Sequence, residues 1–176
     1  MIKAALVGNP NSGKTTIFNQ LSASSERIGN WAGVTVERKE AQLHCHYDCK
    51  SETIMISDLP GTYSMNSYTL DEDVTVKYLK SRHIDVIVNV IDILSFERSL
   101  EFTLQLLEHN IPMVVVINKM DIAKKKKINI DPEMLSNMIK VPVICTQANK
   151  KIGLQDLVDA IITQKYQCQV VCTREE

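Results

Sequence analysis

The sequence predicts an α/β fold in which a mostly parallel sheet, with one antiparallel edge strand, carries helices on both faces. Short apolar runs alternate with stretches of helical composition along most of the 176 residues, as they do when helices connect parallel strands. Residues 36–47 and 52–57 both look like strands and are joined directly by a turn, so this hairpin makes one edge antiparallel. The length suits one compact domain.

Six segments are expected to be strands, and most of them are apolar runs that end at turn or loop signals. The first run stops at Gly8, and the third is followed by Pro60 and Gly61. The segment 84–94 is almost continuously apolar, which is typical of a strand covered on both faces. The six expected strands are residues 2–7, 36–47, 52–57, 84–94, 112–118 and 141–146.

Helix starts carry their own signals. Thr69 and Glu72 have the spacing of a capping box, in which each side chain satisfies a backbone amide of the other residue. Ser95 is expected to cap a helix, and Asp131 followed by Pro132 is a strong helix start. The expected helices are residues 14–22, about 69–80, about 95–109, one that begins at 131, and 154–162, while residues 23–35 are expected to form a loop.

Composition and charge exclude several classes of protein. The formal net charge of −1 gives no global attraction to nucleic acid or to an anionic membrane. The run of lysines at 124–127 is the local exception and is interpreted as a solvated loop, with a membrane or partner patch as the alternative. We expect no signal peptide, since only a short apolar stretch precedes Gly8, and no membrane span, since no run of 18 apolar residues occurs. Five cysteines, an odd and sparse set, favour the reducing cytosol.

Residues 8–15, GNPNSGKT, match the pattern G-x-x-x-x-G-K-[ST] between an expected strand and an expected helix. Glycines allow successive amides to point at phosphate oxygens, and the helix N-terminus adds positive potential. Lys14 is expected to reach the terminal phosphates, and the Thr15 hydroxyl to bind Mg²⁺. The predicted nucleotide contacts in this loop are Gly8, Asn9, Pro10, Asn11, Ser12, Gly13, Lys14, Thr15 and Thr16.

A second motif, NKMD at 118–121, points to guanine. It follows an apolar strand, so it lies at a carboxyl end, where open α/β sheets bind ligands. A carboxylate there accepts both N1–H and N2–H₂ of guanine, which adenine does not offer, and Asp121 is the candidate. Asn118 either bonds the other base edge or braces the loop, and the Lys119 stem packs on the base plane.

The segment 58–61, DLPG, places a carboxylate at the end of another expected strand. Asp58 is expected to hold Mg²⁺ through water, and the Gly61 amide to meet the γ-phosphate. Thr35, on a loop, is expected to supply a second Mg²⁺ contact through its hydroxyl. The further nucleotide contacts expected beside these residues are Leu59, Pro60, Gly33 and Val34. The predicted catalytic residues are Asn11, Lys14, Thr35 and Gly61.

The last candidate recognition element is CTQAN at 145–149, after the last expected strand. Backbone amides of Thr146, Gln147 and Ala148 are in a position to bond the guanine oxygen. A plain strand-to-helix loop is the alternative interpretation.

Together the segments GNPNSGKTT, GNWAGVTVE, DLPGTYS and NKMD resemble the guanine-nucleotide-binding domain of the FeoB family of bacterial ferrous iron transporters. Many GTPases share the first and last segments, whereas RIGNWAGVTVE followed by DLPGTYS narrows the match to this family. The resemblance implies a Ras-like P-loop GTPase fold with six strands. It implies a GTP-binding domain over 1–165 and a tail over 166–176 that begins a linker to helical and membrane regions.

The resemblance also implies a function. The chain is expected to bind GTP and GDP with Mg²⁺, to hydrolyse GTP, and to regulate ferrous iron transport at the cytoplasmic face of the bacterial inner membrane. Implied partners are the helical and transmembrane regions of the transporter and a second G domain in a dimer or oligomer, but not nucleic acid. The alternative is a soluble GTPase acting in ribosome or tRNA maturation, which the near-neutral charge and the segment GNWAGVTVE disfavour.

Hydrolysis is expected to be slow. Ras-type enzymes orient the attacking water with a Gln just after D-x-x-G, and this position is Thr62 here. The resemblance implies a K⁺ ion in the place of an arginine finger, with Asn11 and the carbonyls near Gly29 and Trp31 as ligands. Trp31, the only tryptophan, would then lie in a lid over the nucleotide.

The segment HCHYDC at 44–49 resembles a metal cluster, but strand alternation divides it. His44 and His46 would share one face, and Cys45 and Cys49 the other. Surface-strand residues are the favoured interpretation. A zinc site would need the CxxxC pair at 168–172 to fold back onto this strand.

Overall fold

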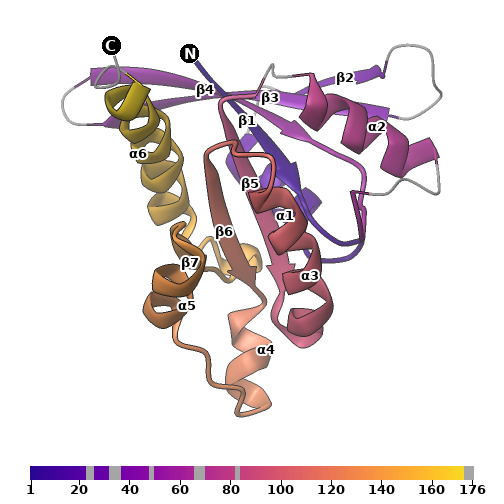
Figure 1. Ribbon diagram of the computed structural model, residues 1–176, viewed down its shortest axis with the longest axis vertical. Coiled ribbons are helices and arrows are strands. Elements are labelled where there is room, and N and C mark those ends of the chain that lie inside the picture. Colours follow the sequence, from indigo (N-terminus) through magenta and orange to yellow (C-terminus); the bar gives the residue numbers. More distant parts are fainter. Residues whose placement is uncertain (23–25, 32–36, 48–49, 66–69, 82–83, 173–176) are drawn as a thin grey trace.

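The computed structural model in Figure 1 describes residues 1–22, 26–31, 37–47, 50–65, 70–81 and 84–172, which form a sheet with helices on both faces. The strands are β1 (Ile2–Val7), β2 (Glu26–Asn30), β3 (Glu37–Tyr47), β4 (Lys50–Asp58), β5 (Val86–Asp92), β6 (Met113–Asn118) and β7 (Val143–Cys145). The α-helices are α1 (Lys14–Ser22), α2 (Leu70–Lys80), α3 (Phe96–Leu107), α4 (Met120–Lys125), α5 (Pro132–Ile139) and α6 (Leu154–Cys172). Two 3₁₀ turns, η1 (Ile93–Ser95) and η2 (Ala148–Lys150), complete the set.

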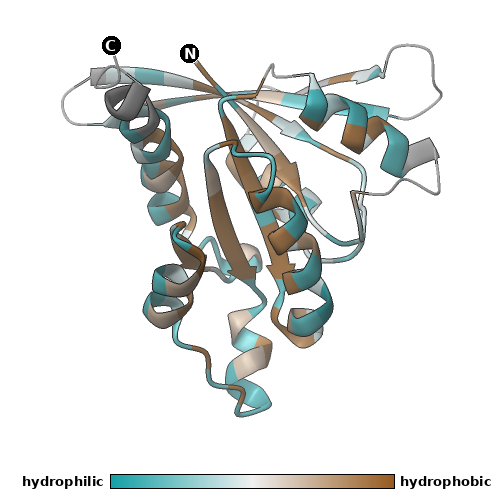
Figure 2. Ribbon diagram, viewed as in Figure 1, coloured by the Kyte–Doolittle hydropathy of each residue, from teal (hydrophilic) through white to brown (hydrophobic). Residues whose placement is uncertain are grey.

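The strand order is β2-β3-β4-β1-β5-β6-β7, and the strands from β4 to β7 are parallel. Their carboxyl ends therefore meet at one edge of the sheet, where the nucleotide motifs follow β1, β4 and β6. The central strands are apolar along their length, as Figure 2 shows in brown, and β6 is buried at every position. Strands that are buried on both faces carry continuous apolar runs, and this pattern predicted the central strands correctly.

Each face of the sheet has its own apolar core. Ile17 and Phe18 of α1 and Leu157 of α6 pack on one face, whereas Phe102 and Leu106 of α3 pack on the other. The α/β class with helices on both faces is thus confirmed.

The predicted count of six strands is wrong, because the described part of the sheet has seven. The additional strand, β2, falls in the predicted loop 23–35 and pairs antiparallel with β3, from Glu26 opposite Ala41 to Asn30 opposite Glu37. Its sequence, ERIGN, shows no apolar alternation, and Ile28 is 67% exposed. Backbone pairing alone defines this strand. The antiparallel strand β3 is consequently not the edge of the sheet, because β2 covers it.

Helix α3 differs from expectation at its start, and its buried face is partly polar. Ser95 stands at the N-cap position but makes no side-chain cap bond, and Asp92 instead caps the preceding 3₁₀ turn through Leu94 N. Leu104, although apolar, is 51% exposed. The residues of α3 that are buried are Ser99, Phe102, Thr103 and Leu106.

The remaining helix signals agree with the structure where it describes them. Asp131 accepts a hydrogen bond from Met134 N at 2.9 Å and starts α5 as predicted. Thr69 of the expected capping box lies outside the described residues. Helix α6 continues through residue 165 to Cys172 without interruption, while the domain boundary at 165 stays a prediction. Within the described ranges, no helix is both long and apolar enough to cross a bilayer.

Candidate nucleotide-binding site

The loop between β1 and α1 has a backbone that only glycine permits at two positions. Gly8 has φ +139°, and a Cβ there would lie 2.2 Å from the carbonyl oxygen of Val90. Gly13 has φ +99°, and a Cβ there would lie 2.1 Å from Asn118 Nδ2. Asn11 is also left-handed, with φ 63°. The loop is therefore packed tightly against β5 and β6 and opens toward the N-terminus of α1.

Lys14 lies across this loop with only 6% of its surface exposed. Its Nζ donates to the carbonyl oxygens of Gly8 at 2.9 Å and Asn9 at 3.0 Å. Burial lowers the pKa of Lys14 to about 8, and the nearby carboxylate of Asp58 opposes this shift. The side chain thus carries its positive charge at neutral pH inside the loop, where a phosphate would be bound.

Thr15 and Asp58 meet beside Lys14. Thr15 Oγ1 donates to Asp58 Oδ2 at 2.9 Å, so a hydroxyl and a carboxylate from two different motifs lie together. These are the hard oxygen ligands that suit Mg²⁺. Gly61 lies against the phosphate loop, because a Cβ added to it would be 2.9 Å from Pro10 Cα. The segment DLPG is therefore in contact with the phosphate loop.

Asn118 joins three parts of the site and is 3% exposed. Its Nδ2 donates to the carbonyl oxygen of Ser12 at 3.2 Å. Its Oδ1 accepts from Thr146 Oγ1 at 3.1 Å and from Ala148 N at 3.2 Å. Of the two predicted roles, this geometry shows the brace. Asn118 ties the phosphate loop to the loop after β7.

Lys119 and Asp121 lie on the same turn. Lys119 is left-handed with φ 66°, and its Nζ donates to the carbonyl oxygen of Asn11 at 2.8 Å and to Asp92 Oδ2 at 2.7 Å. Asp121 lies in the first turn of α4 and is partly exposed. Asp92 was missed by the motif analysis, although an acidic residue at the end of an apolar strand was the signal that identified Asp58.

The amides of the loop after β7 already have acceptors within the protein. Thr146 N donates to Ile117 O at 2.8 Å, and Gln147 N donates to Ile152 O at 3.1 Å. Ala148 N is bonded to Asn118. Their predicted contact with the guanine oxygen stays a prediction. Asn149 of this loop lines one of the two pockets described below, and it was not among the nucleotide contacts predicted from the sequence.

Two adjoining pockets share Asn11, Lys14 and Thr15 in their walls. One, of about 240 Å³, extends toward Glu37 and Lys39 of β3. The second, of about 400 Å³, has the following further lining residues: Gly13, Thr16, Lys119 and Asn149. The first contains the residues suited to phosphate and Mg²⁺. Of the guanine motif, Lys119 lines the second pocket, whereas Asp121 is not among its lining residues.

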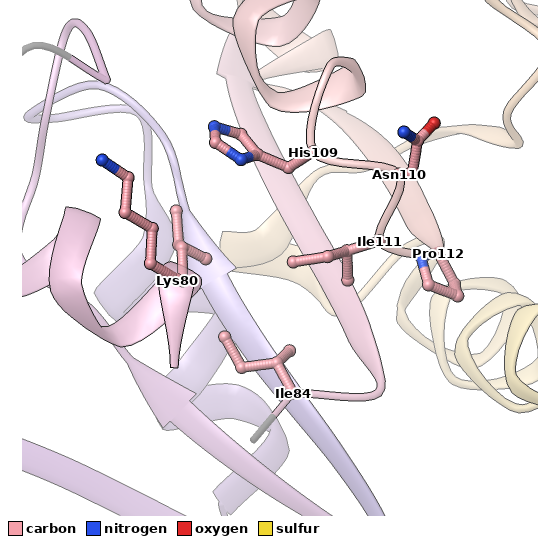
Figure 3. A pocket seen from close by; sticks show the side chains of 7 residues that line it. Lys80, Ile84, His109, Asn110, Ile111 and Pro112 are labelled. Atoms are coloured by element: carbon pink, nitrogen blue, oxygen red, sulfur yellow. The ribbon is translucent and has the colours of Figure 1, made fainter. Parts of the chain in front are cut away.

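A wider hollow of about 590 Å³ lies at the other end of the sheet (Figure 3). Helix α2 ends there at Lys80, and His109 and Asn110 follow the end of α3. Helix C-termini present carbonyl oxygens and negative potential, which disfavour a phosphate group. Size alone therefore does not identify the nucleotide site.

The segment after DLPG is held by α3. Thr62 is fully buried, and its hydroxyl donates to the carbonyl oxygen of Ser64 at 2.7 Å. The guanidinium of Arg98 lies 3.9 Å from the ring centroid of Tyr63. In this arrangement the hydroxyl at the position of the water-orienting Gln is engaged locally.

The residues predicted to bind K⁺ are not brought together here. Gly29 belongs to β2, which β3 and β4 separate from β1 and its phosphate loop. Trp31 is 9% exposed and packs edge-on against Tyr78, with ring centroids 4.7 Å apart. Gly33, Val34 and Thr35 lie outside the described residues. The K⁺ ligands and the second Mg²⁺ contact therefore stay predictions.

Strand β3 divides the His and Cys residues as alternation predicts. His44 pairs with Thr53 through its Nδ1 at 3.2 Å, while Cys45 packs against the core. Among the described residues, no group of three or more His, Cys, Asp or Glu is placed to hold a metal ion. Cys49 and the side chains of Cys168 and Cys172 lie outside this description.

Comparison with known proteins gives consistent matches. The family model described as "Ferrous iron transport protein B" matches residues 2–161. The Fe(2+) transporter FeoB of Escherichia coli (strain K12) is 46% identical over 160 residues, and that of Salmonella typhimurium is 44% identical. Each match covers 89% of this chain and 20% of the transporter. The chain thus spans about a fifth of the length of these relatives.

Solved structures give the same result. The G domain of the T. maritima FeoB iron transporter is 36% identical, with a TM-score of 0.84, and the match covers 93% of this chain and 98% of that one. A GDP-bound mutant of S. thermophilus NFeoB is 40% identical, also with a TM-score of 0.84, over 92% of this chain and 61% of that one. The family match favours the transporter interpretation over a GTPase of ribosome or tRNA maturation.

Proposed function

Because the chain belongs to the ferrous iron transport protein B family, we propose that it is a G domain that binds GTP and GDP and hydrolyses GTP. The observation that carries this proposal is the position of Asn118. Its side chain connects the phosphate loop at Ser12 with the loop that holds Ala148, so one buried group links the motif for phosphates with the motif for guanine. The two adjoining pockets share a wall at Asn11 and Lys14.

The phosphates would bind to Lys14 and to backbone amides of the loop 8–15, in which Pro10 alone has no N–H to donate. The buried ammonium would exchange its two carbonyl partners for phosphate oxygens, so its charge would face the ligand in a site of low dielectric. Thr15 and Asp58 would hold Mg²⁺, which neutralises phosphate charge when bound. Gly61 and Thr35 would contact the γ-phosphate side, as the motifs predict.

Guanine selection would depend on Asp121. Asp121→Asn replaces one carboxylate oxygen, which would accept from guanine, by an amide N–H donor. It should therefore weaken GTP binding and favour XTP, whose exocyclic carbonyl oxygen at C2 needs that donor. Competition between the two nucleotides measures the change. Unchanged GTP affinity in Asp121→Asn would overturn the assignment, whereas wild-type protein that binds neither GTP nor GDP would overturn the proposed function.

Slow turnover is proposed from the side chain at position 62. Thr62 is shorter than Gln, and its hydroxyl is bonded to Ser64. K⁺ stimulation is proposed from the resemblance and from Asn11. Phosphate release would be measured in equal K⁺ and Na⁺, with Asn11→Ala as the variant. Equal rates in the two salts, or a full K⁺ effect in Asn11→Ala, would refute the role of K⁺.

For the whole protein we propose regulation of ferrous iron transport at the cytoplasmic face of the bacterial inner membrane. The support is the similarity to the Fe(2+) transporters of Escherichia coli and Salmonella typhimurium and to the cytosolic domain of L. pneumophila FeoB, to which this chain is 41% identical. The proposed partners are the helical and transmembrane regions of the transporter and a second G domain. Fe²⁺ uptake by cells that carry the full-length protein with Lys14→Ala should fall. Wild-type uptake in that variant would contradict the coupling.

A further inference from the structure

We propose that Asp92, a residue outside the recognised motifs, is a positioning residue that holds Lys119 against the phosphate loop and so increases affinity for guanine nucleotides. The inference rests on the proposed function and adds a residue to the same site. It begins with the register of the sheet, because Asp92 of β5 lies opposite Asn118 of β6, next to Lys119. The carboxylate therefore projects from the strand that neighbours the guanine motif.

The ammonium of Lys119 is held from two sides. Asp92 Oδ2 accepts from Lys119 Nζ at 2.7 Å, and the carbonyl oxygen of Asn11 accepts from the same nitrogen at 2.8 Å. The side chains of Lys119 and Asp92 are 29% and 15% exposed. A partly buried, charge-assisted hydrogen bond is stronger than a surface ion pair. Lys119 thus connects the end of β5 to the phosphate loop.

Asp92 is itself fixed. Its second oxygen, Oδ1, accepts from Leu94 N at 2.9 Å and caps the 3₁₀ turn that follows β5. With one oxygen on the turn and the other on Lys119, the carboxylate has a single orientation. A fixed anion can define the position of a long lysine side chain, which otherwise has many rotamers.

The two residues joined by the hydrogen bond from Lys119 to Asn11 both have an unfavourable backbone conformation. Asn11 and Lys119 are left-handed, at φ 63° and 66°. Such residues persist where surrounding contacts hold them, and they cluster at ligand sites. The bonds from Lys119 to Asn11 and Asp92 are contacts of this kind. Without Asp92, the ammonium would keep the carbonyl alone and lose its charged partner.

The consequence for the nucleotide follows from the pocket of about 400 Å³, which Lys119 and Asn11 both line. The Lys119 stem is the predicted platform for the base plane. A stem that is fixed before the ligand arrives costs less ordering entropy on binding. Loss of Asp92 should therefore weaken nucleotide binding while leaving the bound phosphates in place for hydrolysis.

If Asp92 only capped the 3₁₀ turn through Leu94 N, its role would be purely structural. One substitution separates this role from the proposed positioning of Lys119. Asp92→Asn keeps an oxygen acceptor for Leu94 N but removes the negative charge that holds Lys119. Lys119→Met keeps the apolar stem and removes the ammonium. A matched control exists at the other end of the same strand, where Asp85, just before β5, forms an ion pair with Lys165 of α6.

The test measures the Kd for GDP of purified full-length chains carrying Asp92→Asn, Lys119→Met, both, or Asp85→Asn. Asp92→Asn should raise the Kd about tenfold, equivalent to the cost of ordering one long side chain on binding. It should change the Kd less than about twofold once Lys119→Met is present, because its effect acts through that ammonium. Asp85→Asn should stay within about twofold of wild type.

Steady-state GTP hydrolysis gives an independent readout, since Asp92→Asn should raise KM and leave kcat within about twofold of wild type. An unchanged Kd in Asp92→Asn, or effects of Asp92→Asn and Lys119→Met that multiply, would refute the positioning role. A fall in kcat without a rise in KM would also refute it. Failure of the wild-type chain to bind GDP would instead refute the proposed function, and this inference with it.

Discussion

Asn118→Ala removes only a small side chain, but it should lower both the stability of the protein and its affinity for nucleotide. The side chain is 3% exposed and takes part in three hydrogen bonds, to Ser12 O, Thr146 Oγ1 and Ala148 N. Alanine would leave these three groups buried without their partner. Each lost bond is worth about 1 kcal/mol, so the free energy of unfolding should fall by about 3 kcal/mol. For a chain of this length, that is a drop in Tm of about 9 °C.

The assay is urea unfolding of the nucleotide-free protein, followed by measurement of the Kd for GDP. The Kd should rise at least about tenfold, because the phosphate loop and the loop after β7 lose their common support. Asn137→Ala is the matched control, since Asn137 is exposed on α5. It should change stability by less than about 0.5 kcal/mol.

Two results would refute this reasoning. A loss of stability below about 1 kcal/mol in Asn118→Ala would mean that the three groups find other partners, for instance water. A loss of about 3 kcal/mol with an unchanged Kd would mean that the brace supports the fold without organising the nucleotide site.

Three further predictions concern the phosphate loop and the edge of the sheet. Burial lowers the pKa of Lys14 to about 8, below its value of 10.5 in the unfolded chain, so between these two pH values the unfolded state binds more protons and stability rises with pH. Urea titrations should show this rise in the wild type, and a rise of equal size in Lys14→Met would contradict the assignment. Tyr78→Leu removes the edge-on partner of Trp31, so the free energy of unfolding should fall by about 2 kcal/mol. The tryptophan emission should also move to longer wavelength. An unchanged spectrum would show that the ring contact does not form in solution. Gly8→Ala should cost about 3 kcal/mol because of its positive φ and the lack of space, whereas Gly29→Ala, which has open space, should cost less than about 0.5 kcal/mol; similar costs measured by chemical unfolding would disprove this packing argument.

The central strands and the residues of the two nucleotide motifs could be identified from the sequence because both depend on local chemistry. Strands such as β6 are apolar throughout, and burial on both faces demands that pattern. The motifs at 8–15 and 118–121 need particular residue types at particular spacings, since glycine, lysine and carboxylate functions are not interchangeable there. Asp131 with Pro132 also started a helix as predicted.

Features that depend on distant partners could not be predicted in the same way. Strand β2 is defined by its pairing with β3, and its own residues show no strand pattern. The role of Asp92 depends on the register between β5 and β6. The choice of Asn118 as a brace depends on the loop after β7 lying beside the phosphate loop. Each of these requires knowledge of which segments become neighbours.

Helix α3 shows how such neighbours extend the site beyond its motifs. Its buried face carries the polar residues Ser99 and Thr103, and Gln105 is half-buried. Thr103 Oγ1 accepts from Asn89 Nδ2 at 2.7 Å within the sheet, while Ser99 and Gln105 contact two loops of the site. Asn9 of the phosphate loop donates to Ser99 Oγ at 3.0 Å. Gln105 Oε1 accepts from Met65 N at 2.8 Å and from Ser64 Oγ at 3.2 Å, in the segment after DLPG. One helix therefore contacts both loops that are proposed to meet the phosphates, and a movement of the Ser64–Met65 segment must break or shift its bonds to α3. The energy of the bonds from Ser64 and Met65 to Gln105 thus opposes such a movement.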